Sequence, residues 1–206
     1  MLSSIHPLGE RGRGNRFGQT ATAFVLGSVI GGVTTGAIVG GLGALLRGVI
    51  ELVGGSLSPA AALTIVTVAG VVAVLVELTG GSLPAVHRQV NEDWLQEYRN
   101  WVYGFGFGFQ LGAGVTTYIT SAAVLMWLAA ILFSGSLAGS VLIGATFGLT
   151  RGLAILTVRH VDSPADLVSF HRRLHQSSPL VWRAGSYALL GLCLFAGVAA
   201  IDRWLP

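Results

Sequence analysis

The sequence predicts an all-α fold, a polytopic membrane helix bundle of about five transmembrane helices with a possible internal repeat. The first observation is composition. Of 206 residues, 52% are hydrophobic and only 10% are charged, and the mean hydropathy is +0.72, whereas soluble domains carry about 25% charged residues. The second is that several uncharged runs approach or exceed the roughly 20 residues that cross a bilayer. This composition argues against most soluble enzymes, coiled coils and disordered regulators.

Uncharged runs of sequence indicate where the individual helices lie. These runs cover residues 17–46, 52–76, 100–150 and 184–201. The third run is too long for one helix, and a Gly- and Ser-rich stretch at 133–139 divides it. We therefore expect transmembrane helices near 19–46, 58–78, 103–133, 139–158 and 183–202. Residues 1–18 are expected to form a polar cytoplasmic N-terminal tail, and 19–206 a single transmembrane domain.

Two connecting segments, 84–102 and 163–178, are predicted to lie at the membrane surface. The first carries too many charges to span a bilayer, and its apolar residues recur at steps of three and four, which is typical of an interfacial amphipathic helix. The second is expected to be similar, because Ser163 and Pro164 are typical of a helix start.

The basic residues set the orientation. All twelve are arginines, which suggests a GC-rich prokaryotic genome. With five helices, nine of the twelve lie on one side, and the other side has only Arg47 and Arg203. By the positive-inside rule the N-terminus is cytoplasmic and the C-terminus lies outside the plasma membrane. Because the arginines are scattered at segment ends, we expect no nucleic-acid partner.

Glycines at four-residue spacing form three stripes, at which helix backbones can approach closely in lipid. This favours a tightly packed monomeric bundle, with a homodimer through one stripe as the alternative. The expected partners are the lipid bilayer and a further membrane protein or a second copy. The stripes are Gly32, Gly36 and Gly40; Gly104, Gly108 and Gly112; and Gly144, Gly148 and Gly152.

Two segments suggest an internal repeat. Residues 31–36 read Gly-Gly-Val-Thr-Thr-Gly, and residues 113–118 read Ala-Gly-Val-Thr-Thr-Tyr. Both lie near the middle of long apolar runs and precede a shorter helix. Transporter folds often contain such repeats, with interrupted helices near the bilayer midplane. A chance match is the alternative, since Gly, Val and Thr are common in membrane helices.

The second copy resembles a known family. Residues 108–121, Gly-Phe-Gln-Leu-Gly-Ala-Gly-Val-Thr-Thr-Tyr-Ile-Thr-Ser, are similar to the G-x-x-F-x-x-G-W-T-P-C-I-G-P motif of the CcdA and DsbD membrane domains, of the LysE-type superfamily. Residues 147–156, Phe-Gly-Leu-Thr-Arg-Gly-Leu-Ala-Ile-Leu, look like that family's following helix. The resemblance implies three helices per inverted half, whereas this chain lacks the third helix of its first half.

The redox chemistry of that family is not expected here. The resemblance implies one cysteine per repeat, passing electrons outward from cytoplasmic thioredoxin, but Gly36 and Tyr118 stand at those positions. Thr117 and Ser121 stand in place of the flanking prolines. Thiol–disulfide exchange needs a thiolate attacking a disulfide. The single cysteine, Cys193, is expected to be a small buried apolar residue.

Polar residues at the two Gly-Val-Thr-Thr segments form the candidate substrate or ion site. Broken helices present hydroxyls and freed carbonyls to a cation or small anion. The alternative is that each threonine hydroxyl bonds to a carbonyl of its own helix four residues earlier. The candidates are Thr34, Thr35, Gln110, Thr116, Thr117, Tyr118 and Thr120.

Charged and metal-ligating side chains supply two further hypotheses. Arg151 is expected at membrane depth, where a charge indicates function, with Glu77 as counter-charge; snorkelling to the cytoplasmic interface is the alternative. His171 and His175 have a spacing that suits a transition metal. Because Arg172 and Arg173 disfavour a cation there, a helix that attracts anionic lipid is the favoured interpretation.

Three functions follow as hypotheses. The first is a small-solute or ion transporter with a central polar site at the Gly-Val-Thr-Thr helix breaks. The second is a non-catalytic accessory or assembly subunit of a larger membrane complex. The third is transmembrane electron transfer using a partner's thiols or a cofactor. No hydrolase elbow, Walker loop, zincin or Rossmann motif is present. We therefore expect no catalytic residue and no resident cofactor or metal.

Overall fold

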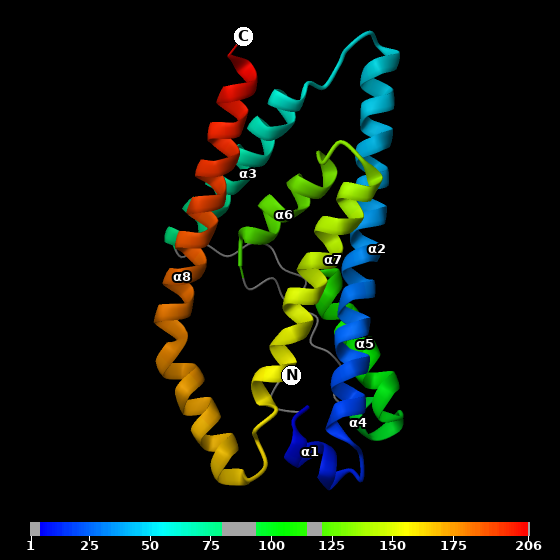
Figure 1. The fold of residues 1–206 in the computed structure, drawn as a ribbon, viewed down its shortest axis with the longest axis vertical. Helices are drawn as coiled ribbons and strands as arrows, with labels where there is room; N and C mark the ends of the chain where they lie inside the picture. Colours follow the sequence, from blue (N-terminus) through cyan, green and yellow to red (C-terminus); the bar gives the residue numbers. More distant parts are fainter. Residues whose placement is uncertain (1–4, 80–93, 115–120, 206) are drawn as a thin grey trace. The chain divides into compact units, whose positions relative to one another are not determined.

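A computed structural model describes residues 5–79, 94–114 and 121–205, and that part of the chain is helical, without strands. Figure 1 shows the order of the elements along the chain. They are α1 (Pro7–Gly12), α2 (Phe17–Leu52), α3 (Pro59–Leu78), α4 (Trp94–Glu97), α5 (Asn100–Ala113), α6 (Ala123–Leu132), α7 (Leu137–Leu153), the short 3-10 helix η1 (Ala154–Val158) and α8 (Pro164–Trp204).

Four helical stretches are long and apolar enough to cross a membrane. They are α2, α3, Leu137–Val158 and α8, while α6 is a shorter apolar helix. Large apolar side chains stay exposed along them, as at Leu42, Val68 and Phe195. Such extensive apolar exposure suits lipid rather than water. The chain is thus a multi-pass helical membrane protein, with four candidate spans in its described part where the sequence predicted five.

The single helix predicted over 103–133 is wrong: the chain forms α5 and α6 instead. α5 ends at Ala113 because Gly114 takes the left-handed conformation, with φ 73°, and its N–H bonds to the carbonyl of Leu111. A left-handed glycine is a common helix terminator. Apolar composition continues on both sides of Gly114, so hydropathy could not locate this end.

The two helices predicted at 163–178 and 183–202 are one helix, α8. It has 41 residues, or about 60 Å at 1.5 Å per residue. Pro179 lies inside it and lacks one N–H donor, yet helical residues continue on both sides. Ser163 caps its start, since the Asp166 N–H donates to Ser163 Oγ and the Ser163 N–H donates to Asp166 Oδ2. This reciprocal pair is a capping box.

Two predicted surface segments also differ in detail. Within 84–102 the described part starts at α4, which covers only Trp94–Glu97, and α5 already begins at Asn100. The N-terminal 18 residues contain α1, and Ile5, His6 and Glu10 there are buried. The polar tail therefore includes a short folded segment that packs into the first unit.

The chain divides into two compact units. The first comprises Met1–Val33, His87–Tyr118 and Ala145–Val181. Its core combines residues from α2, α5 and η1 with Ile5, which precedes α1, and Val161, which follows η1. The N-terminal segment therefore belongs to the packed body. The buried core residues are Ile5, Ala21, Phe24, Tyr103, Phe107, Ile155, Val158 and Val161.

The second unit comprises Thr34–Val86, Ile119–Gly144 and Trp182–Pro206. In it, α3 packs against α6, and the C-terminal part of α8 joins the same core. Cys193 is buried, with its Sγ 3.9 Å from the Sδ of Met126. Its place as a small core residue matches the sequence expectation. The buried core residues are Val66, Ala73, Ala122, Met126, Leu189, Cys193 and Ala196.

Candidate functional site

The first predicted helix break is absent. α2 runs unbroken from Phe17 to Leu52, through Thr34 and Thr35. The glycines that suggested a break are contact points instead. Gly31 lies against the Phe109 carbonyl in the first unit, and Gly36 lies against the Ser140 carbonyl in the second. Each glycine inside a helix destabilises it, because glycine loses more conformational entropy on folding than other residues do. In α2, the close backbone packing at Gly31 and Gly36 offsets this loss. Thr35 is 7% exposed.

The second predicted break is described only on one side. Thr116, Thr117, Tyr118 and Thr120 lie outside the described residues, and Gln110 is half-buried on α5. α5 ends at Ala113, three residues after Gln110, and Gly114 follows as the first residue of the Gly-Val-Thr-Thr sequence. A shared polar lining that joins the two segments stays a prediction.

Glu77 and Arg151 each have partners in their own unit. The Glu77 carboxylate accepts hydrogen bonds from Ser121 Oγ and, at 3.3 Å, from Ser186 Oγ. The Arg151 guanidinium lies over the Phe147 ring, 5.4 Å from its centre. This is a cation–π contact. Glu77 and Arg151 belong to different units, and their predicted pairing stays a prediction.

His171 and His175 are both exposed on α8. His171 Nδ1 lies 2.9 Å from the Leu167 carbonyl oxygen of the preceding turn. Among the described residues no group of three His, Cys, Asp or Glu side chains could hold a metal ion. The histidine spacing thus gains no third ligand in the part of the chain that the structure describes.

A buried carboxylate that the sequence did not single out lies in the first unit. Glu10 is 0% exposed. Its carboxylate accepts hydrogen bonds from Tyr103 Oη at 2.6 Å, from Thr20 Oγ1 at 2.7 Å and from Arg13 Nη2 at 2.6 Å. Asn15 Nδ2 donates to Tyr103 Oη at 3.3 Å. We call these five residues the Glu10 cluster.

The buried carboxylate of Glu10 has hydrogen-bond donors on both of its oxygens. A buried charge is tolerated when it is paired and hydrogen-bonded, and three donors from α2, α5 and the residue after α1 meet this requirement. Burial lowers the pKa of Arg13, and the hydrogen bond and negative charge of Glu10 raise it by more, so that it lies above its ordinary value. The cluster fastens the N-terminal segment to α2 and α5.

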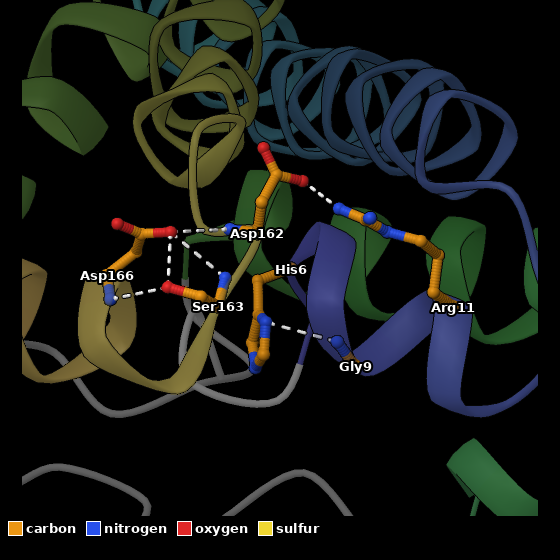
Figure 2. Close-up of polar contacts among 6 residues, drawn as sticks. All are labelled: His6, Gly9, Arg11, Asp162, Ser163 and Asp166. Carbon is orange, nitrogen blue, oxygen red and sulfur yellow. Dashed lines mark hydrogen bonds and ion pairs between the residues drawn. The ribbon is translucent and has the colours of Figure 1, made fainter.

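Contacts along α1 also connect it to the chain before α8, and Figure 2 shows the ion pair between Arg11 and Asp162. The Leu8 N–H donates to the Val161 carbonyl at 3.1 Å, and Arg11 forms an ion pair with Asp162. Both charged side chains are more than half exposed, so this pair contributes little. His6 Nδ1 accepts from the Gly9 N–H at 3.1 Å and caps α1.

The predicted glycine stripes lie at contacts inside the two units. Gly104, Gly108 and Gly112 of α5 lie against the carbonyls of Thr20, Phe24 and Ser28 on α2, where an added Cβ would meet backbone. Gly148 and Gly152 also lie against Ser28, whose Oγ donates to the Gly148 carbonyl at 2.6 Å.

The remaining glycines of the stripes also lie at helix contacts or are buried. In the second unit, Gly40 meets the Ser140 side chain and Gly36 its carbonyl. Gly32 and Gly144 are buried. The glycines therefore sit where these helices touch one another, which is the arrangement expected of internal packing.

The helices and their contacts define the class: a multi-pass helical membrane protein with close-packed, glycine-lined helix contacts. No protein-family model matches the chain, and no solved structure matches it. The chain is similar to the methylamine utilization protein MauF of Paracoccus denitrificans, with 32% identity over 157 residues. The match covers 74% of this chain and 55% of that protein, so the chain spans about half the length of this relative.

Proposed function

We propose that this chain is a multi-pass component of the prokaryotic plasma membrane that serves methylamine utilization. The observation that carries the proposal is the similarity to MauF. Because the match covers 74% of the chain, it extends over most of the helical body rather than over one short motif. The proposed orientation has a cytoplasmic N-terminus and an external C-terminus, as the arginine distribution suggests.

Within that role, we favour an accessory or assembly subunit over a carrier. α2 is continuous through Thr34 and Thr35, which removes one of the two helix breaks on which a central site was based. In addition, the glycines of α5 lie directly against backbone carbonyls of α2. Contacts this close leave no space for a solute between these two helices. Close packing of this kind suits a rigid body that holds a partner.

Growth of the parent organism tests the proposed role. A deletion strain is expected not to grow on methylamine as the energy source and to grow normally on succinate with ammonium. A plasmid copy of the intact chain should restore growth on methylamine. Normal growth of the deletion strain on methylamine, with no second copy of the gene present, would contradict the proposal.

Transport remains the second candidate, and one observation favours it. α5 ends at Ala113, and the left-handed Gly114 that follows is the first residue of the second Gly-Val-Thr-Thr segment. A helix end inside an apolar run leaves backbone carbonyls available to an ion or solute. Solute-dependent thermal stabilisation of the purified chain would support this candidate. The resemblance to the CcdA and DsbD membrane domains is compatible with either candidate.

Electron transfer is the least supported of the three hypotheses. The chain has a single cysteine, Cys193, which is buried beside Met126. A dithiol–disulfide cycle needs two thiols, so any such cycle requires a partner's thiol or a bound redox group.

A further inference from the structure

A cavity of about 690 Å³ lies within the second unit, where several chain ends and turns meet. Residues from α2, α3, α6, α7 and α8, and from the turn between α6 and α7, line it. The volume falls within the range of about 300–1,000 Å³ typical of small-molecule sites. Most of the lining is apolar and includes Pro59, Leu63, Phe133 and Leu142. We call it the arginine pocket, for the reason that follows.

Two arginines line this cavity: Arg47 from α2 and Arg203 from α8. Of the described residues that line it, none is acidic. The ion pairs found in the described part of the chain join Arg11 to Asp162 and Arg13 to Glu10, and so leave both pocket arginines out. Two positive charges that are 156 positions apart in sequence thus share one largely apolar cavity.

The same two arginines stood out in the sequence. Arg47 and Arg203 are the basic residues predicted on the outer side, where the positive-inside rule disfavours them. Each lies close to a helix end, before Leu52 in α2 and before Trp204 in α8. Trp204 Nε1 donates to Thr64 Oγ1 at 3.3 Å. A tryptophan at the end of a spanning helix is typical of headgroup depth.

We propose that the arginine pocket binds one anionic phospholipid. The phosphodiester lies between Arg47 and Arg203, and an acyl chain lies along the apolar wall at Leu63 and Leu142. Charge complementarity requires an anion, since arginines pair strongly with phosphate oxygens. The apolar wall favours a ligand with an aliphatic portion, because a free inorganic anion could pair with the arginines but would leave the apolar wall unfilled. An amphiphile satisfies both requirements. This inference is independent of the methylamine role.

Binding of defined lipids to the purified full-length chain tests the proposal. Native mass spectrometry in non-ionic detergent would titrate phosphatidylglycerol and, separately, zwitterionic phosphatidylcholine. The wild type should prefer phosphatidylglycerol. Arg47→Gln or Arg203→Gln should each weaken its binding about fivefold, and the double variant about thirtyfold, from the attraction of about one basic residue each. Arg16→Gln removes an exposed arginine outside the pocket and should leave phosphatidylglycerol binding unchanged.

Two further measurements distinguish binding of a lipid from binding of a free anion. Ala62→Phe narrows the cavity beside its apolar wall and should weaken phosphatidylglycerol binding about fifteenfold, roughly the effect of losing two methylene contacts. Millimolar inorganic phosphate should not displace the lipid. Displacement by phosphate, unchanged binding by the double arginine variant, unchanged binding by Ala62→Phe, or equal affinity for the two lipids would each overturn the proposal. An unchanged elution volume and melting temperature would establish that each variant is folded.

Discussion

Gly108 offers a quantitative test of the packing between α5 and α2. An alanine Cβ built there would overlap the carbonyl oxygen of Phe24 and lie 2.9 Å from the Phe24 Cα. Both obstacles are backbone atoms, so no side-chain rotation can relieve them. α5 would have to move away from α2, which would also loosen the contacts of Gly104 and Gly112. Overpacking of this kind costs about 1–3 kcal/mol, and a backbone obstacle favours the upper end.

The expected net effect of Gly108→Ala is smaller than the steric cost. Alanine gains about 1 kcal/mol of helix propensity over glycine, which leaves a net loss of about 2 kcal/mol in the free energy of unfolding. For a chain of this size that is about 4–8 °C in Tm. Tryptophan fluorescence during heating of the detergent-solubilised protein would measure it.

Gly191→Ala is the matched control for this substitution. Gly191 also lies inside a helix, α8, but a Cβ there meets nothing within 4 Å. Its melting temperature should stay constant or rise slightly. If Gly108→Ala is as stable as wild type, or gains stability as Gly191→Ala does, then α5 does not pack on α2 through this stripe.

The remaining predictions concern charged side chains. Glu10→Ala leaves Arg13, Thr20 and Tyr103 without their shared acceptor and should lower stability by about 3–5 kcal/mol, measured by the same melting assay. Arg11→Ala, which removes an exposed ion pair, should cost at most about 1 kcal/mol; equal effects of the two would refute the assignment of a structural role to Glu10. Arg151→Leu should lose growth on methylamine while its melting temperature changes little, because its cation–π contact is worth about 1 kcal/mol. Wild-type growth of Arg151→Leu would argue against a functional role for this arginine.

Hydropathy predicted the parts of the fold that depend on the bilayer. The α3 helix occupies Pro59–Leu78, close to the predicted 58–78, because its composition changes sharply at both ends. The end of α5 could not be found in this way. It depends on the φ of Gly114, and glycine elsewhere in the same sequence lies inside helices. Pro179 shows the converse: a residue that usually ends helices lies inside α8.

The polar contacts were harder to predict than the helices, for a physical reason. Glu10 and Tyr103 are 93 positions apart, and no periodic pattern connects them. A polar, arginine-rich N-terminal segment resembles a solvated tail, and only the fold reveals that its one carboxylate is buried. The arginine pocket likewise joins residues from opposite ends of the sequence, although the positive-inside rule had already marked both arginines as exceptions.

We propose above all that this membrane protein acts as an accessory subunit in methylamine utilization. Purification of an affinity-tagged copy from membranes of methylamine-grown cells, in mild detergent, tests it most directly. We predict a stoichiometric membrane partner that is absent from a parallel purification of succinate-grown cells. Recovery of the chain alone under both conditions, together with thermal stabilisation by a small solute, would contradict the subunit role and favour transport.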